Sequence, residues 1–369
     1  MTAATAAYAE RLSRVRRAMT DKGIDVLLLS VGADLPWLTG YEAMPLERLT
    51  MLVAHRDGEA TLVVPTLEAP RVVEQPGVFA IRRWDETDDP VAIVAGLAGK
   101  ASTAAIGDTT WARFLLALQR EMPSTAFSRA VEVTGALRAQ KDASEIAALR
   151  RAGAAADRVA TALQSGDIAL VGRTEAAVSA EISARLLAEG HHQVNFAIVA
   201  AGENAASPHH DASDRVIRSG EVVLCDFGGT LDGYCSDITR CVSLGAPPSE
   251  VRDAYDVLFE AQASAVKAAV VGTPCEDVDA AARSIIAGAG YGPQFIHRTG
   301  HGIGVEAHED PYIVEGNELR LAPGHAFSIE PGIYVAGRFG LRLEDIVVAT
   351  DEGPDAMNRV AHELVVVDA

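Results

Sequence analysis

The sequence lacks an uninterrupted apolar segment of the roughly 20 residues that a membrane-spanning helix needs. Its first stretch, MTAATAAYAERLSRVRRAMTDKG, is Ala-rich with interspersed arginines and predicts an amphipathic helix over about residues 5–22. This stretch also lacks the apolar block of a signal peptide. We therefore expect a cytoplasmic protein without a membrane partner.

Paired cysteines and an excess of basic residues are missing as well. The four cysteines, Cys225, Cys235, Cys241 and Cys275, form no CxxC pair and are interpreted as reduced, mostly buried thiols. Against 51 Asp and Glu stand 32 Lys and Arg, which gives a formal net charge of −19. This charge argues against a nucleic-acid partner and an anionic membrane. A solvated acidic surface and a site that gathers cations explain it equally well.

The order of predicted elements changes near residue 138, and 369 residues suit two domains better than one core. Before this point, alternating helix and strand patterns with one hairpin signal predict a small α/β domain without a catalytic constellation. After it, a long helix opens with Asp142 and Glu145 in capping-box spacing. We therefore predict an N-terminal domain over residues 1–138 and a second domain over residues 139–369.

Two segments of the second domain share one frame, DRVIRSGEVVLCDFG and NELRLAPGHAFSIEPG. Each combines a glycine, a short apolar strand and an acid, Asp226 or Glu330. A return strand then carries a second acid, Asp237 in SDITR or Glu344 in LRLEDIVV. Further helices are predicted to begin near Thr174, Ser249 and Glu276. The pattern predicts two similar halves, each of which supplies a pair of carboxylates.

The first pair shares one face of a hairpin if Asp232-Gly233 forms a two-residue turn. Asp226 then pairs with Thr239, and Gly228 lies opposite Asp237, where it leaves room for a bound ion. Because side chains alternate faces with a period of two, the two acids become diagonal neighbours roughly 7–8 Å apart at the backbone. Four such acids on one concave face repel one another and need about four positive charges, which two divalent cations supply.

Histidines gather in the glycine-rich segment HRTGHGIGVEAHEDP, which contains His297, His301 and His308. Its glycines argue against a helix and predict a strand or loop that approaches another group closely. On a strand, His297 and His301 face the same side. Upstream, SPHH adds His209 and His210. A surface or hydrogen-bonded histidine explains any one of them, but the cluster indicates a functional site.

At these residues the chain resembles the M24 metallopeptidases of the pita-bread fold, which include Xaa-Pro aminopeptidase, Xaa-Pro dipeptidase (prolidase) and methionine aminopeptidase. The resemblance covers roughly residues 205–350 and implies five metal ligands, which are Asp226 in DFGG, Asp237 in SDITR, His301 in HGIG, Glu330 in IEPGIY and Glu344 in RLEDIV. It also implies surrounding functional residues, namely His209, His297, His308 and Arg342. The N-terminal part looks like a creatinase-type domain, which argues against a simple methionine aminopeptidase.

The resemblance implies an α/β (α+β) chain with a C-terminal pita-bread domain that contains an internal pseudo-twofold repeat, after a smaller creatinase-type N-terminal α/β domain. It implies a metallo-exopeptidase that hydrolyses Xaa-Pro bonds in dipeptides or short peptides with proline at the second position. Two divalent ions are expected; Mn²⁺ suits the mostly hard ligands best, and Co²⁺, Zn²⁺ or Fe²⁺ also fit. Because family members are commonly dimers, a homodimer is expected.

The resemblance also implies a mechanism. Two ions about 3.5–4 Å apart share a water and make hydroxide available to attack the scissile carbonyl. Glu330 then passes the proton to the leaving imide nitrogen of proline, while His209 and His308 stabilise the intermediate. The remaining catalytic residues in this scheme are His297 and Arg342, and the expected substrate contacts are His209, His297, His308 and Tyr312.

Tyr312 marks a departure from the family pattern. Several prolidases have an arginine four residues after the histidine that His308 matches, where it holds the C-terminal carboxylate of a dipeptide. HEDPY has Tyr312 at that position. This weakens strict dipeptidase action unless another cation replaces the arginine, so the peptide length stays open.

Two other functions remain alternatives. One is a dinuclear aminopeptidase without strict proline preference, and the other is a metal-free pita-bread domain that acts as a binding module. The presence of all five ligand types argues against the binding module, and for the same reason against metal-free, creatinase-like hydrolysis.

Overall fold

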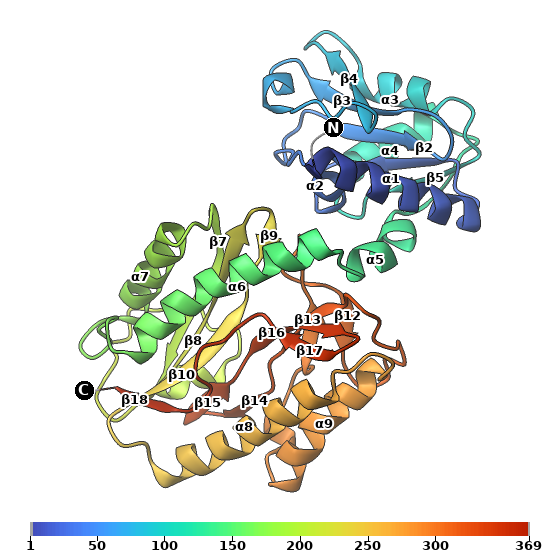
Figure 1. Cartoon of the computed structure of the whole chain (residues 1–369). Helices are drawn as coiled ribbons and strands as arrows, with labels where there is room; N and C mark the ends of the chain where they lie inside the picture. The colour runs from blue at the N-terminus through green and yellow to red at the C-terminus, as the bar shows by residue number, and fades with distance from the viewer. Residues whose placement is uncertain (1–2, 368–369) are drawn as a thin grey trace. The chain divides into compact units, whose positions relative to one another are not determined.

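The computed structural model describes residues 3–367 of the chain, which divides into two compact units, Met1–Arg138 and Ala139–Ala369 (Figure 1). Both units mix helices with sheets, so the predicted α/β fold class is confirmed. Within the described residues, the helices are too short or too polar to cross a bilayer.

The first unit is built on a six-stranded sheet in the order β4-β3-β2-β1-β5-β6. The strands are β1 (Val26–Leu29), β2 (Met51–His55), β3 (Ala60–Pro65), β4 (Phe79–Trp84), β5 (Thr103–Ile106) and β6 (Ala126–Arg129). The helices are α1 (Ala3–Lys22), α2 (Asp34–Thr39), η1 (Ala69–Arg71), α3 (Pro90–Ala98), α4 (Ala112–Glu121) and α5 (Val131–Ala139). Buried side chains of β1 and β2 pack against α3 and α4 to form its core.

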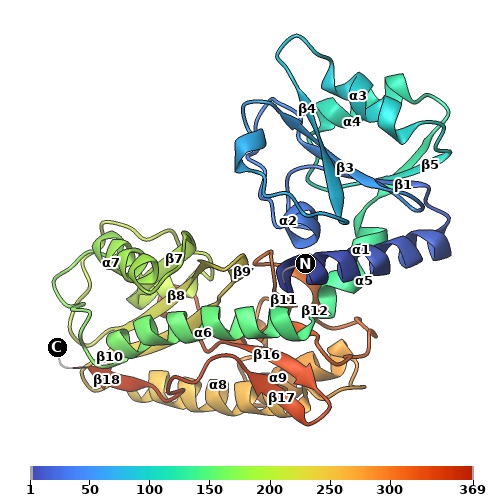
Figure 2. The same cartoon turned by 45° about the horizontal axis from the view of Figure 1, so that its top comes forward.

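The second unit contains two five-stranded sheets, in the orders β18-β10-β8-β7 with β9 paired to β8, and β12-β11-β13-β16-β17. Its strands are β7 (Gln193–Ala201), β8 (Val222–Leu231), β9 (Tyr234–Cys235), β10 (Ile238–Leu244), β11 (Gly300–Gly302), β12 (Glu309–Ile313), β13 (Ala326–Ile329), β14 (Gly332–Val335), β15 (Phe339–Arg342), β16 (Asp345–Thr350), β17 (Gly353–Ala356) and β18 (Val365–Val367). Its helices are α6 (Ala143–Gln164), α7 (Glu175–Ala188), η2 (Gly202–Ala206), α8 (Ser249–Ala268), α9 (Cys275–Gly288) and η3 (Gly292–Gln294). The four long helices lie outside the strands (Figures 1 and 2).

The predicted starts of these helices are confirmed. Asp142 accepts hydrogen bonds from the amides of Ser144 and Glu145, and the Glu145 side chain returns one to the Asp142 amide, which completes the capping box of α6. Thr174 caps α7 by accepting from the amide of Ala177. These caps satisfy amides that the first turn of a helix leaves without partners.

The hairpin of β8 and β10 has the predicted register. Asp232 and Gly233 have φ of 52° and 79°, as a two-residue primed turn requires. Leu231 pairs with Tyr234, and Asp226 pairs with Thr239. The space beside Gly228 is occupied by backbone, because an added Cβ would lie 2.1 Å from the carbonyl oxygen of Ser236. This glycine therefore permits close packing of the chain rather than leaving room for an ion.

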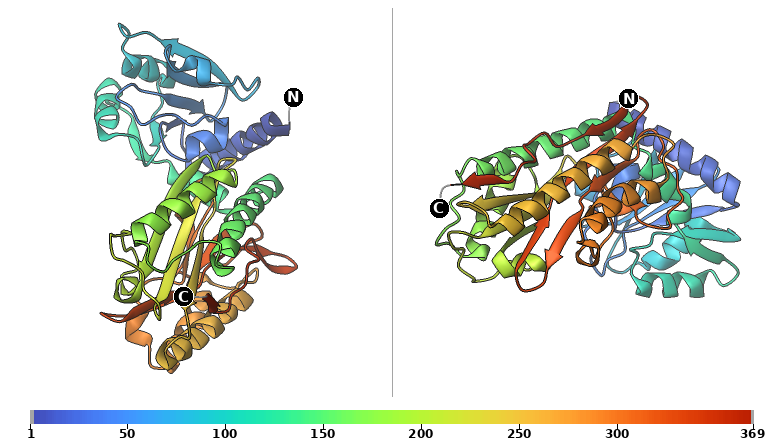
Figure 3. Two further views of the ribbon diagram at one scale, coloured as in Figure 1. Left: turned by 90° about the vertical axis from the view of Figure 1, so that its left-hand side faces the viewer. Right: turned by 90° about the horizontal axis from the view of Figure 1, so that it is seen from below.

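Strand alternation directs Asp226 toward the interior of the second unit. Val223, Cys225 and Phe227 of β8 pack with α6 and α7, whereas Leu224 packs in the cluster formed by α8, α9 and the second sheet. Asp226 follows Leu224 by two positions and so lies on the same face. The sheets meet on this side, where Thr239 of β10 forms an isolated bridge with Glu344. Figure 3 shows the green and yellow strands of this unit beside its orange and red strands.

The two halves of this unit repeat one set of backbone contacts. The amide of Gly172 donates to the carbonyl of Ile217 at 2.9 Å, and the amide of Gly272 donates to the carbonyl of Leu321 at 2.8 Å. Each bond lies just before the second helix of its half and just before the strand that carries the first acid. The internal repeat predicted from the sequence frame is thus present in the hydrogen bonding.

Arg240 joins the chain segments beside the predicted ligands. Its side chain is fully buried and makes an ion pair with Asp345 at 2.7 Å. It also donates to four backbone carbonyls, those of Thr239, Glu344, Val360 and Ala361. One guanidinium therefore holds β10, the start of β16 and the C-terminal segment together.

We predict that Arg240→Gln lowers the free energy of unfolding of the second unit by about 3–5 kcal/mol, because it removes the guanidinium that pairs with Asp345 and leaves several buried carbonyls without a donor. Urea unfolding measures the change. Arg218→Gln on the exposed surface is the matched control and should stay within about 0.5 kcal/mol of the parent. Equal stability of both variants would contradict this account of Arg240.

Candidate metal centre

A cavity of about 820 Å³ lies in the second unit, and its lining is rich in groups that bind cations. The carboxylates are Asp211, Asp226, Asp237, Glu330 and Glu344, and the histidines are His209, His210, His297, His301 and His308. Arg298 and Arg342 are the two arginines of this lining. Every site residue predicted from the sequence therefore borders one cavity, with the exception of Tyr312.

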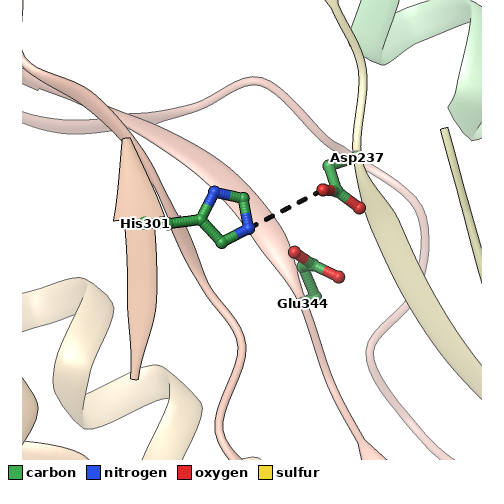
Figure 4. Close-up of side chains that lie close together, drawn as sticks. All are labelled: Asp237, His301 and Glu344. Atoms are coloured by element: carbon green, nitrogen blue, oxygen red, sulfur yellow. Dashed lines mark ion pairs between the residues drawn. The ribbon is translucent and has the colours of Figure 1, made fainter. Parts of the chain in front are cut away.

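Asp237, His301 and Glu344 lie closest together. One ligand atom from each falls within 4.8 Å of the other two, and all three residues are buried (Figure 4). Nε2 of His301 lies 3.8 Å from Oδ2 of Asp237. Metal–ligand bonds of about 2.0–2.2 Å on either side of one ion span such separations. Asp237 precedes β10, His301 lies on β11 and Glu344 follows β15, so the trio comes from both halves of the repeat.

Glu330 borders this trio from the end of β13. Its Oε1 lies 3.2 Å from Nε2 of His301 and accepts a hydrogen bond from the Ser328 hydroxyl at 3.0 Å. The Ser328 hydroxyl in turn accepts from the amide of His301 at 3.0 Å. Ser328 thus sets the position of Glu330 relative to His301.

Asp226 is the fourth acid of the cluster and forms an ion pair with Arg342. Nε of Arg342 also donates to the Thr239 hydroxyl at 3.1 Å, and that hydroxyl donates to Glu344 at 2.6 Å. Arg342 is buried and supplies one positive charge to four carboxylates. The cluster therefore remains short of positive charge.

The shortage of positive charge, together with burial, raises the pKa of three of the four acids. Burial raises the pKa of Asp237 well above its ordinary value, and the neighbouring Glu344 and Asp226 raise it further. Burial also raises the pKa of Glu344 well above, and that of Asp226 above, the ordinary values. For Glu330 the upward effect of burial is outweighed by the hydrogen bond and charge of His301, so its pKa falls to about 2.

Divalent cations fit the residues present. Oδ1 of Asp226 and Oδ1 of Asp237 are buried and accept no hydrogen bond in the described part of the chain. A buried carboxylate oxygen without a partner is costly unless a cation binds it. Carboxylates with one imidazole form the hard, mixed ligand set that suits Mn²⁺ and related divalent ions.

The histidines around the acids differ in the freedom of their rings. Nδ1 of His297 donates to the carbonyl of Arg298 at 2.7 Å, and Nε2 accepts from the Tyr334 hydroxyl at 2.8 Å, so both ring nitrogens are engaged within the protein. The ring of His308 lies 3.8 Å from that of His301, centroid to centroid. Burial lowers the pKa of His308 to about 4.

Two buried carboxylates on the helices hold the loops that carry histidines. Glu175, at the start of α7, accepts from the Ala201 amide at 2.9 Å and from the Ser213 hydroxyl at 2.6 Å, and it pairs with His210 at 2.8 Å. The exposed His209 lies within the loop that these contacts enclose. Glu175 therefore fixes the loop at both ends.

Asp279 of α9 does the same in the second half. It accepts from the amide of Thr299 at 3.0 Å and from its hydroxyl at 2.7 Å, and it pairs with Arg283. Arg283 then donates to the carbonyl of His297 at 2.9 Å. The segment that leads into β11 is thereby fixed on both sides of Arg298.

Sequence reasoning missed several residues of the cavity. Phe196 and Ile198 of β7 and Ile296, which is 63% exposed, supply an apolar wall. Arg298 was missed too, because an arginine between two histidines gives no periodic signal. The alternation of β7 could have placed Phe196 and Ile198 on one face but could not have shown what that face meets.

Buried oxygen ligands and an imidazole, gathered where two similar halves meet, define a metal-dependent enzyme of the pita-bread fold. Residues 147–351 match the Metallopeptidase family M24, and residues 11–140 match the Creatinase/Prolidase N-terminal domain. The chain belongs to metallopeptidase family M24. The predicted family, the pita-bread domain and the assignment as a peptidase are thereby confirmed.

Relatives match the chain over nearly its whole length. It is 44% identical over 365 residues to the probable dipeptidase PepE of Mycobacterium tuberculosis, which covers 98% of this chain and 96% of that protein. It is 36% identical over 362 residues to the Xaa-Pro dipeptidase of Lactobacillus delbrueckii subsp. lactis, covering 96% and 98%. The crystal structure of dipeptidase PepE from Mycobacterium ulcerans superposes with a TM-score of 0.92 at 44% identity and covers 99% of both chains.

We predict that chelation of metal lowers the melting temperature of the second unit. Mn²⁺ at about 100 times its Kd should raise the melting temperature of the metal-free protein by roughly 5–10 °C, because binding favours the folded state and relieves repulsion among the acids. Differential scanning calorimetry measures the shift. It should shrink in Asp237→Asn and persist in Asp351→Asn, an exposed control. The same shift in both variants would place the ion elsewhere.

Proposed function

We propose that this protein is an Xaa-Pro dipeptidase that uses two divalent metal ions. The observation that carries the proposal is the buried trio of Asp237, His301 and Glu344, bordered by Glu330 and Asp226, inside a cavity with an apolar wall. The names of the relatives, dipeptidase PepE and Xaa-Pro dipeptidase, support the substrate class.

Five side chains hold the ions in this proposal, namely Asp226, Asp237, His301, Glu330 and Glu344. When bound, the ions lower the pKa of water and polarise the scissile carbonyl. The carboxylates that line the cavity offer hydrogen-bond acceptors to the free amine of the substrate, which favours removal of an N-terminal residue over cleavage within a long chain.

Glu330 moves the proton in this mechanism. Its carboxylate accepts a proton at Oε1 or Oε2 and delivers it to the departing imide nitrogen of proline. The hydrogen bond from Ser328 fixes the position of Glu330, so its carboxylate is already oriented for proton transfer when the substrate binds.

The histidines outside the ligand set donate hydrogen bonds to the substrate or position other groups. His308 is neutral at neutral pH because its pKa is low, and Nδ1 accepts from Arg298 at 3.4 Å. Nε2 of His308 therefore carries the proton and donates to the substrate carbonyl oxygen. His209 on its exposed loop supplies a second donor. His297 and Arg342, whose polar atoms are engaged within the protein, position the groups around them.

The ring of proline packs against the apolar wall of Phe196, Ile198 and Ile296.

The catalytic domain spans residues 139–369 and the N-terminal domain residues 1–138. Mn²⁺ is the resident metal because oxygen ligands predominate. A cytoplasmic location agrees with four free, buried cysteines. The functional form in this proposal is a homodimer.

Replacing Glu330 by Gln should lower kcat for Ala-Pro by about 10²–10⁴-fold, since the amide cannot carry the proton. The circular dichroism spectrum should stay that of the parent. Glu352→Gln, on an exposed turn, is the matched control and should keep full activity. A Glu330→Gln variant with undiminished kcat would remove this residue from the mechanism.

Cleavage of Ala-Pro, Ala-Pro-Pro and Met-Ala-Ser, compared side by side with Mn²⁺ or Co²⁺ present, tests the proposed function. We expect the proline substrates to be cleaved and Ala-Pro to be preferred. Cleavage of Met-Ala-Ser without cleavage of either proline substrate would show an aminopeptidase of broader specificity instead. An inactive protein that binds no metal would show a binding module.

A further inference from the structure

His308, the proposed donor to the substrate, is held only weakly through its ring. This ring lies 3.8 Å from that of His301, and its Nδ1 accepts from Arg298 at 3.4 Å, beyond the usual range of such hydrogen bonds. Arg298 is itself only partly buried, and its guanidinium carbon lies 4.3 Å from the ring centroid of Tyr312. The place of His308 in the cavity therefore depends on the backbone that carries it.

A buried ion pair fixes that backbone one residue further on. Glu309 begins β12 and pairs with Gly302 of β11. Oε1 of Glu309 accepts a hydrogen bond from Nζ of Lys141, and the Glu309 and Lys141 side chains are 7% and 1% exposed. The residue that follows His308 is thus tied to a segment 168 residues away in the chain.

Lys141 lies on a segment that is itself fixed. Its amide donates to the carbonyl of Gly324 at 2.8 Å, and Gln140 before it forms an isolated bridge with His325. Asp142 after it is the N-cap of α6 and accepts hydrogen bonds from the first turn of that helix. A lysine whose backbone is held on both sides can determine the position of its partner.

Two glycines make room for this ion pair. A Cβ added to Gly304 would lie 2.6 Å from Oε1 of Glu309 and 2.9 Å from Cε of Lys141. A Cβ added to Gly324 would lie 2.5 Å from the carbonyl oxygen of Lys141, and the φ of Gly324 is 88°. Gly304 belongs to the glycine-rich segment that carries the histidines. The close approach expected of that segment is, at this residue, an approach to the ion pair.

Stability alone explains this ion pair poorly. The cost of taking two charges out of water offsets most of their attraction, and well-packed apolar side chains often stabilise a core equally well. An ion pair differs from an apolar contact in its geometry, because the carboxylate must meet the ammonium group at hydrogen-bond distance. Such a contact fixes the position of Glu309, and with it the position of the residue before it.

We propose that Lys141 is a positioning residue for the reaction, which acts through Glu309 to hold His308 where its ring can donate to the substrate carbonyl oxygen. The inference rests on the proposed peptidase function and adds a residue that precedes α6 to its mechanism. A misplacement of about 1 Å can lower a reaction rate by about 100-fold, so loss of the ion pair is expected to slow the chemical step.

A double variant tests the proposal on the Mn²⁺-loaded full-length protein. Lys141→Met/Glu309→Gln replaces both charges by neutral side chains of similar size, so neither charge of the pair is left without the other. Its kcat for Ala-Pro should fall about 10- to 100-fold while KM stays within about threefold, because the donor acts in the transition state. Its melting temperature should lie above that of the single variant Lys141→Met.

The same double variant combined with His308→Ala separates positioning from a general effect on the fold. Because Lys141 acts through His308, the two changes should lower kcat by no more than about twofold once His308 is absent. Lys267→Met/Glu260→Gln, the same two changes on exposed residues of α8, is the matched control and should behave like the parent.

A nuclear magnetic resonance spectrum of the metal-free protein gives a readout that does not depend on catalysis. In protein that contains isotope-labelled histidine, the ring signals of His308, assigned by their loss in His308→Ala, should shift in the double variant. The ring signals of His210, which pairs with Glu175, should stay in place.

The outcomes separate the two proposals. An undiminished kcat, unshifted His308 signals, or an equal loss of kcat in the presence and absence of His308 would each overturn the role of Lys141 while the peptidase assignment stands. A parent protein that cleaves neither Ala-Pro nor Ala-Pro-Pro would overturn the proposed function and this inference with it.

Discussion

The mutual repulsion of buried carboxylates is the constraint on which the second unit depends. Asp226, Asp237, Glu330 and Glu344 share one cavity with a single buried guanidinium, that of Arg342. Added positive charge would stabilise such a cluster, and one oxygen each of Asp226 and Asp237 has no hydrogen-bond partner among the described residues. Surrounding residues, which include Ser328 and Arg240, hold the four acids close together despite their mutual repulsion.

The repeat explains how one chain meets this constraint. Each half brings an acid on or directly after an apolar strand, a second acid directly before a later strand, and a helix whose buried carboxylate, Glu175 or Asp279, anchors a histidine loop. Because the predicted ligands come from both halves, neither half holds a complete candidate site. The bridge between Thr239 and Glu344 brings the halves into contact beside the candidate metal centre.

Much of this architecture follows from the sequence, and the rest depends on contacts that no local pattern records. Alternation and the Asp232-Gly233 turn fix the register that puts Asp226 and Asp237 on one face, and capping residues fix the starts of α6 and α7. By contrast α2 is six residues long with Pro36 inside it and lacks a side-chain cap, so propensity gives no sign of it. The role expected for Gly228 was wrong because a backbone carbonyl, invisible to periodicity, fills the space. Arg298 became visible only once Tyr312 and His308 were placed beside it.

The alternation of side chains along β8 also determines which donor atoms the cavity offers, and therefore which metal ions it favours. It turns Asp226 inward and Cys225 outward into the helix-packed core, where burial raises the pKa of the thiol. Among the described residues, none that lines the cavity is a cysteine. A soft ion such as Cu(I) therefore finds no sulfur donor there, although Cys225 is the sequence neighbour of the predicted ligand Asp226. Because Cys225 and Asp226 point to opposite faces of β8, the donor atoms of the candidate metal centre are oxygen and nitrogen.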